Sequence, residues 1–208
     1  MKQIKNIIFD LGGVLINLDI PATIAAYDAI CEKPFESIYT QLKQTPLFDR
    51  FDKGSITELD FFTELKKTIK TNADIDQLKK AWNTMLLDFP PHRLELLKTL
   101  GKHYRLFLLS NTNETHITVF EQTLKTHYNC NNLEPFFEKV YYSCRMNMRK
   151  PNVEIFNYVL KENDLSPEQT LFIDDTQQHI DGALKAGIYA HLLEKGKDVG
   201  ELIKELKL

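Results

Sequence analysis

Four short apolar runs along the chain each end in polar residues, which is the pattern of buried β-strands. The runs are Ile7–Phe9, Tyr104–Leu109, Val140–Tyr142 and Thr170–Ile173. From about Tyr104 onward, β-rich runs alternate with segments that have apolar residues at helical spacing. These helices are expected near Glu114–Thr126, Val153–Glu162, Gln177–Ala186 and Val199–Leu206. The alternation predicts an α/β core, with a parallel sheet and helices on both faces.

Several residues indicate where the helices of this core begin and end. Pro151 suits the first position of a helix, and Gly187 suits the end of one. The segment Ser166–Gln169 has the pattern of a capping box with a proline start.

Residues 17–90 carry almost no strand signal, and helices are expected in four parts of this segment. These are Ile20–Cys31, Phe35–Lys43, Ile56–Ile69 and Ile75–Leu87. The third helix is expected to start at Ser55, with Glu58 three residues later as in a capping box. About 70 residues exceed what a crossover between parallel strands needs. We therefore expect an all-helical cap at residues 17–90, inserted after the first strand of a core made of residues 1–16 and 91–208.

Composition narrows the class of protein. The chain has 208 residues, 43% of them hydrophobic, with a formal net charge of −3 and a pI near 6.1, so it offers no basic surface for nucleic acid. No apolar run approaches a membrane span, and Asp10 interrupts the signal-peptide-like start. Cys31, Cys130 and Cys144 lack metal or redox spacing, which favours reduced thiols. We expect a cytoplasmic protein, a monomer or weak dimer, that binds neither nucleic acid nor membrane.

The candidate chemistry lies in the polar residues after the strands. The four clusters are Asp10 with Gly12 and Gly13, Ser110 with Asn111, Lys150, and Asp174 with Asp175. Taken singly, these residues are typical of turns, helix N-caps or an exposed lysine. The carboxyl ends of parallel strands meet at one edge of a sheet, where ligands bind. Four such clusters together predict a single site.

The charges of these residues indicate a metal ion. If Asp10, Asp174 and Asp175 converge, each close pair repels by about 4 kcal/mol at an effective dielectric constant near 20. A cluster of oxygen ligands suits Mg²⁺ with room for a phosphate oxygen. Lys150 and Mg²⁺ together supply three positive charges, which balance the three carboxylates. A phosphate dianion would then enter a roughly neutral site. Ser110, Asn111 and nearby backbone N–H groups have the composition of an anion cradle.

The four clusters together resemble the four motifs of the haloacid dehalogenase (HAD) superfamily. Their order matches, as do the spacings of 100, 40 and 25 residues between Asp10, Ser110, Lys150 and Asp175. The helical insert falls where the cap of the superfamily's first class belongs, on a Rossmann-like core. The motif strings are most similar to those of the bacterial α-D-glucose-1-phosphatase-like group.

This resemblance implies a Mg²⁺-dependent phosphatase that acts on a small phosphorylated metabolite. Asp10 would attack phosphorus and form an aspartyl-phosphate, which water hydrolyses. Asp10, the Gly12 carbonyl and Asp175 would hold Mg²⁺, with Asp174 as a further ligand or outer support. The remaining residues implied by the resemblance would bind the phosphate oxygens, and they are Ser110, Asn111 and Lys150.

The chain departs from the family pattern at Gly12. Phosphatases of this superfamily usually carry a second Asp at this position as general acid and base. Losing a positioned acid typically costs a factor of about 10² to 10⁴ in rate. Because the anomeric oxygen of a sugar 1-phosphate leaves more easily than an ordinary alcohol, we expect a sugar phosphate, such as a hexose 1-phosphate, as substrate.

Three alternatives remain open from the sequence. A haloacid dehalogenase also uses an Asp nucleophile, but it needs neither metal nor the Asp174–Asp175 pair. A phosphonatase needs a cap lysine, for which Lys43, Lys53, Lys66 and Lys67 are available. A non-catalytic protein that binds a phosphorylated ligand is compatible with Gly12.

The cap is expected to select the substrate by closing over the site. Arg50, in the polar stretch 48–54, and Asp19 are candidate specificity residues. Trp82 is a weaker candidate, because a tryptophan on a helix more often belongs to the core.

Overall fold

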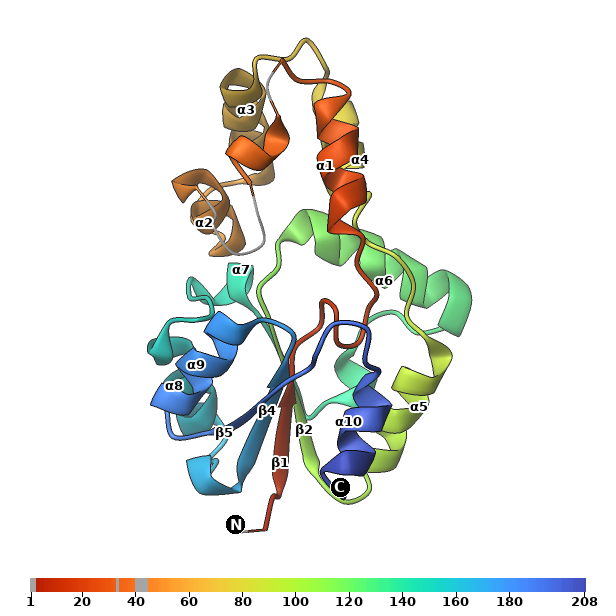
Figure 1. Cartoon of the computed structure of the whole chain (residues 1–208), viewed down its shortest axis with the longest axis vertical. Helices are drawn as coiled ribbons and strands as arrows, with labels where there is room; N and C mark the ends of the chain where they lie inside the picture. Colours follow the sequence, from red (N-terminus) through yellow and green to blue (C-terminus); the bar gives the residue numbers. More distant parts are fainter. Residues whose placement is uncertain (1–2, 33, 40–44) are drawn as a thin grey trace.

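Five parallel strands form one sheet at the centre of the molecule (Figure 1). The computed structural model describes residues 3–32, 34–39 and 45–208. The strands are β1 (Asn6–Phe9), β2 (Arg105–Ser110), β3 (Lys139–Tyr142), β4 (Thr170–Asp174) and β5 (Tyr189–Leu192). Their order is β3-β2-β1-β4-β5, and every neighbouring pair is parallel. The α/β fold class is confirmed.

Alternate residues of each strand pack on opposite faces of the sheet. On β1, Ile7 and Phe9 belong to one apolar cluster and Ile8 to another. The first face is covered by α5 (Pro91–Leu100), α6 (Glu114–Tyr128) and α10 (Val199–Glu205), and the second by α8 (Val153–Glu162) and α9 (Gln177–Lys185). Helices therefore lie on both faces, as the sequence predicts.

The predicted strands and the four predicted core helices are all present, with helix ends within two residues of expectation. Gly187, with φ of +81°, follows the last residue of α9, as predicted. Two boundary predictions are wrong. Pro151 precedes Asn152, the N-cap of α8, and Ser166 caps only a short 3₁₀ turn, η3 (Pro167–Gln169), without a side-chain hydrogen bond. Pro151 lies before the N-cap of α8, and Pro167 begins only a 3₁₀ turn and not an α-helix.

The insert after β1 is helical and stands above the carboxyl edge of the sheet (Figure 1). Its helices are α1 (Ile20–Asp28), η1 (Phe35–Ser37), α2 (Pro46–Asp52), α3 (Glu58–Ile69) and α4 (Ile75–Asn83). Aromatic rings fill its core, with Phe51 stacked on Phe61 at 4.0 Å between centroids. Of the described helices, none combines the length and apolar character that a membrane crossing requires.

The sequence predicts this insert less well than the core. In place of the helix expected at Phe35–Lys43, the structure has the short 3₁₀ helix η1, which ends at Ser37. Residues 40–44 of that expected helix region lie outside the described part of the chain. Helix α2 was not predicted. The N-cap of α3 is Thr57 and not Ser55, because the Thr57 hydroxyl accepts the Asp60 N–H at 3.1 Å.

The first and fourth helices of the insert also end earlier than predicted. Helix α1 ends at Asp28, where Cys31 was expected, and α4 ends at Asn83, where Leu87 was expected.

The insert contacts the core on two sides. On one side, α4 meets α6, where the ring of His116 stacks on Trp82 with centroids 5.1 Å apart. Nε2 of His116 also lies 3.3 Å from the Trp82 carbonyl oxygen. On the other side, the residues after α2 meet α7 (Ser143–Met146) so closely that a Cβ on Gly54 would lie 1.9 Å from the Cys144 carbonyl oxygen.

We predict that His116 makes the stability of the protein depend on pH. Burial lowers the pKa of His116 to about 4, whereas an unfolded histidine titrates near 6.5. The unfolded chain therefore binds more protons between these values, so stability falls as pH drops from 6.5 to 4, by about 3 kcal/mol in all. Urea unfolding across this range measures the loss, and His116→Gln is expected to flatten it.

The matched control is His127→Gln, which removes an exposed histidine from the same helix. This control variant is expected to keep the wild-type pH dependence. An unchanged slope in His116→Gln would contradict the prediction.

Candidate active site

The polar residues that follow β1, β2 and β4 meet at the carboxyl edge of the sheet. Asp10 follows β1, Ser110 ends β2 and Asp174 ends β4. They are brought together because β1 lies between β2 and β4, with Phe9 in register with Leu108 and Ile173. This is the edge where open α/β sheets bind ligands.

A cavity of about 120 Å³ lies between this edge and the insert. The predicted site residues that line it are Asp10, Gly12, Ser110, Asn111 and Asp175. Lys150 and Asp174 are both fully buried beside it.

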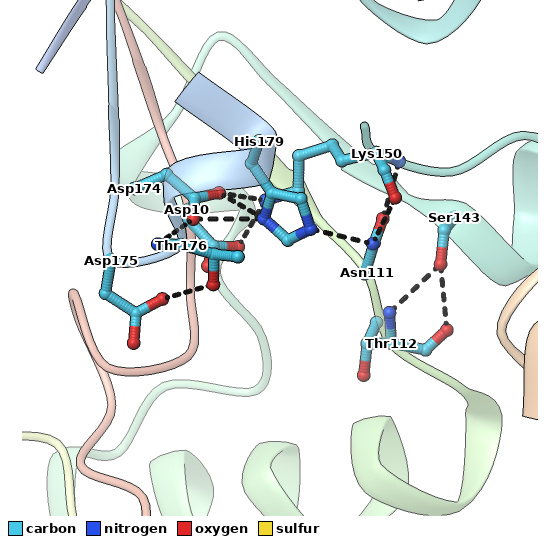
Figure 2. Close-up of polar contacts among 9 residues, drawn as sticks. All are labelled: Asp10, Asn111, Thr112, Ser143, Lys150, Asp174, Asp175, Thr176 and His179. Atoms are coloured by element: carbon cyan, nitrogen blue, oxygen red, sulfur yellow. Dashed lines mark hydrogen bonds and ion pairs between the residues drawn. The ribbon is translucent and has the colours of Figure 1, made fainter. Parts of the chain in front are cut away.

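The buried Lys150 ammonium joins two of the carboxylates (Figure 2). Its Nζ donates to Asp10 Oδ1 at 2.7 Å and to Asp174 Oδ2 at 2.6 Å. Nζ also lies 5.2 Å from the centre of the Phe172 ring. Burial alone would lower the pKa of Lys150, but the two carboxylates raise it above its ordinary value, so the ammonium stays charged.

One ammonium does not balance three carboxylates. Burial and the charges of Asp174 and Asp175 raise the pKa of Asp10 to about 8, although Lys150 opposes them. Burial also disfavours ionised Asp174, but Lys150 and His179 outweigh it and lower the pKa of Asp174 to about 2. Burial and Asp174 raise the pKa of Asp175. Protons on Asp10 and Asp175, or a further cation, would therefore balance the charge that Lys150 leaves uncompensated.

The geometry of the carboxylates fits a metal ion. One oxygen from each of Asp10, Asp174 and Asp175 lies within 4.8 Å of the others. Three oxygen ligands suit a hard divalent cation such as Mg²⁺. The donor set and its excess negative charge thus agree in pointing to a metal site.

The loop after β1 is shaped around Asp175. Gly13 has φ of +71°, and a Cβ there would lie 2.2 Å from Asp175 Oδ2, so a larger residue would displace this carboxylate. Gly13 N–H also donates to the Ile16 carbonyl at 2.9 Å, closing the loop. At Gly12 a Cβ would meet the side chain of Leu18, with Cδ1 at 2.8 Å and Cγ at 3.8 Å. An apolar side chain therefore lies beside the position that lacks an acid.

His179, which sequence reasoning missed, contacts Asp174. Its Nδ1 lies 3.0 Å from both carboxylate oxygens, and Thr176 N–H donates to Asp174 Oδ1 at 2.8 Å (Figure 2). Together with Lys150, these groups occupy both oxygens of Asp174. The spacing of five residues between Asp174 and His179, across the start of α9, is the sequence signal that could have found this contact.

The side chain of Asn111 forms two hydrogen bonds with the main chain of Lys150. Its Nδ2 donates to the Lys150 carbonyl, and its Oδ1 accepts the Lys150 N–H, both at 2.9 Å (Figure 2). In this structure the amide clamps the main chain of Lys150, and the contact of Asn111 with phosphate stays a prediction. The N-cap of α6 is Asn113, and the N-cap of α9 is Thr176. The helix N-cap role that the sequence left open therefore falls to none of Ser110, Asn111, Asp174 and Asp175.

The two predicted specificity residues do not line the cavity. Asp19 caps α1 by accepting the Ala22 N–H at 3.0 Å, and Arg50 pairs with the exposed Glu64 at 2.7 Å. Neither is among the residues that line the cavity. The residues of the insert that do reach it include Tyr39, Asp52 and Trp82, and Arg149 reaches it from the core. Asp52 belongs to the stretch 48–54 that the sequence pointed to.

Comparison with known proteins gives concordant matches. A family model described as haloacid dehalogenase-like hydrolase matches residues 7–192. D-ribitol-5-phosphate phosphatase of Bacteroides thetaiotaomicron is 26% identical over 198 residues, covering 94% of this chain and 95% of that protein. Phosphorylated carbohydrates phosphatase of Thermotoga maritima is 23% identical, covering 92% of this chain and 88% of that protein.

Among solved structures, the HAD family enzyme BT-2542 of Bacteroides thetaiotaomicron, in complex with magnesium and inorganic phosphate, superposes with a TM-score of 0.84. It is 34% identical and covers 96% of this chain and 98% of that chain. The family match spans most of the sequence, including all five strands and the insert. The chain therefore belongs to the haloacid dehalogenase-like hydrolase family.

Proposed function

We propose that the protein is a Mg²⁺-dependent phosphatase that hydrolyses a small phosphate monoester through an aspartyl-phosphate at Asp10. The observation that carries this proposal is the largely buried cluster of Asp10, Asp174, Asp175 and Lys150, in which three carboxylates that could hold a metal ion face one ammonium. The related enzyme that binds both magnesium and inorganic phosphate supports it.

In the first step, a carboxylate oxygen of Asp10 attacks phosphorus, the bond from phosphorus to the leaving oxygen breaks, and this oxygen takes a proton from water to leave as an alcohol. Lys150, whose Nζ lies 2.7 Å from Asp10 Oδ1, orients this carboxylate and faces the charge on the transferring group. In the second step, water attacks phosphorus, releasing phosphate and restoring Asp10.

Asp10, Asp175 and the Gly12 carbonyl would hold Mg²⁺, which stabilises the charge on the phosphoryl oxygens. Asp174 would act mainly from the outside, because Lys150, His179 and Thr176 already occupy its oxygens.

The phosphate would also contact Ser110 at the end of β2. Ser110 is 3% exposed and lines the cavity with Asp10. Asn111 would act indirectly, because its side chain holds the main chain of Lys150.

The proposed substrate class is a phosphorylated sugar or sugar alcohol. The relatives that act on ribitol 5-phosphate and on phosphorylated carbohydrates support this class. Hexose 1-phosphate, favoured by the missing acid at Gly12, is one candidate substrate within this class. Membership of the α-D-glucose-1-phosphatase-like group remains part of the proposal.

The insert would act as the cap over this site. We place the core at residues 1–16 and 91–208 and the cap at 17–90. The separate apolar cluster of the insert, from Tyr27 to Met85, supports this division.

The alternatives fit the site less well. A dehalogenase does not need the carboxylate pair, and a pure binder does not need a nucleophile. For a phosphonatase, Lys53, Lys66 and Lys67 are not among the described residues that line the cavity, and Lys43 lies outside the described part of the chain.

Phosphate release from a panel of esters, with and without Mg²⁺, tests the proposed reaction. The panel includes ribitol 5-phosphate and glucose 1-phosphate. Asp10→Asn keeps the shape of the side chain but removes the nucleophile, so kcat is expected to fall by at least about 10³-fold. Thermal unfolding checks that the variant is folded. Turnover that survives in folded Asp10→Asn would refute the role of Asp10.

A second prediction concerns Asp175 and the metal. Removing Mg²⁺ with a chelator is expected to abolish turnover, and Asp175→Asn is expected to raise the Mg²⁺ concentration for half-maximal activity at least about tenfold. The control is Asp181→Asn, an exposed carboxylate on α9, which should keep the wild-type requirement. Equal Mg²⁺ requirements in wild type and Asp175→Asn would count against this metal site.

A further inference from the structure

Part of the cavity wall is made of polar residues that the proposed phosphoryl chemistry does not use. These residues are Asp52 and Trp82 of the insert and Arg149 of the core, with Tyr39 beside them. Their side chains carry a carboxylate, an indole N–H, a guanidinium and a phenol, and all four residues line the same cavity as Asp10.

Asp52 and Arg149 supply opposite charges from opposite sides of the junction between insert and core. Arg149 Nη2 lies 3.6 Å from Asp52 Oδ2, and Arg149 Nη1 lies 3.2 Å from Asp49 Oδ1. Asp52 is only 7% exposed, and its main-chain carbonyl lies 2.5 Å from the Ser143 hydroxyl. These contacts hold both side chains in place before a ligand arrives.

Trp82 adds a buried donor to this wall. Its side chain is 2% exposed, and its Nε1 has no hydrogen-bond partner among the described residues. The indole is held by the edge of Tyr39, with centroids 5.1 Å apart, and by the stacked ring of His116. A buried N–H without a partner costs about 1 to 3 kcal/mol, so an acceptor oxygen from a ligand would be favourable.

The chemistry of this wall indicates what it binds. A carboxylate accepts hydrogen bonds from hydroxyl groups, and a guanidinium and an indole donate to hydroxyl oxygens. The charges of Asp52 and Arg149 compensate each other, so the wall does not favour a second phosphate or an ammonium group. The cavity, at about 120 Å³, suits a short organic group.

We infer that Asp52, Arg149 and Trp82 form a hydroxyl-binding subsite that selects phosphate esters of short polyhydroxylated alcohols over apolar esters. The inference rests on the proposed phosphatase function and names what recognises the leaving group. Discrimination of this kind is strong where a ligand without hydroxyls leaves buried polar groups unpaired.

The test compares two five-carbon esters of the same charge, ribitol 5-phosphate and n-pentyl phosphate. The measured quantity is the ratio of kcat/KM for the first to kcat/KM for the second. Asp52→Asn is expected to lower this ratio at least about tenfold. Trp82→Phe keeps an aromatic ring but removes the N–H, and it is expected to lower the ratio as well, which provides a second variant should the first not fold.

Asp76→Asn is the matched control, because Asp76 is an exposed carboxylate on α4, the helix of Trp82, and does not line the cavity. The ratio in this control is expected to equal that of wild type. A ratio unchanged in both Asp52→Asn and Trp82→Phe, or lowered equally in Asp76→Asn, would overturn the subsite.

A binding measurement separates failure of the subsite from failure of the phosphatase proposal. Trp82 is the sole tryptophan of the chain, so its fluorescence reports directly on the cavity. Ribitol 5-phosphate and n-pentyl phosphate are titrated into the Asp10→Asn variant with Mg²⁺, or into wild type if it hydrolyses no ester. Binding of ribitol 5-phosphate at least about tenfold tighter than n-pentyl phosphate supports the subsite, and equal affinity overturns it.

Discussion

A lysine ammonium buried between two carboxylates organises this protein. Lys150 is fully buried, and its Nζ bridges Asp10, directly after β1, and Asp174, the last residue of β4. Breaking a buried pair of this kind typically costs about 3 to 5 kcal/mol, because a charge is left without a partner. The pairing is possible only because β1 and β4 are neighbours with their ends level, and because the segment after β3 returns across β2. The sheet order and the site geometry are therefore one constraint.

The same cluster explains why the site is incomplete without a cation. Asp174 is well compensated by Lys150, His179 and the Thr176 N–H, whereas Asp10 and Asp175 have raised pKa values in the absence of a metal. The negative charge is thus compensated at Asp174 but not at the other two carboxylates. Asp10 and Asp175, which line the cavity, remain available to a metal ion and to the substrate, whereas Asp174 holds Lys150.

Core and insert contribute different chemistry to the cavity. The core supplies the carboxylates, Ser110 and the clamp of Asn111 on the Lys150 main chain. The insert supplies Asp52 and Trp82, which do not touch the carboxylate cluster but face the same space. Since the insert packs its own aromatic core, its cavity-lining residues can differ without disturbing the lysine and the carboxylates. In the proposed phosphatase, the core would set the reaction type and the insert would set the substrate preference.

The sequence alone determined strands β1 to β4, the core helices and the polar residues at the strand ends, because alternation and local turn chemistry are short-range signals. It also identified Asp10, Lys150, Asp174 and Asp175 as one group, since parallel strand ends must share an edge. Only the tertiary structure decided that Asn111 clamps the Lys150 main chain, that His179 contacts Asp174, and that Asp52 and not Asp19 or Arg50 reaches the cavity. These outcomes depend on which helix face turns inward and on contacts between segments far apart in sequence, and neither leaves a local pattern.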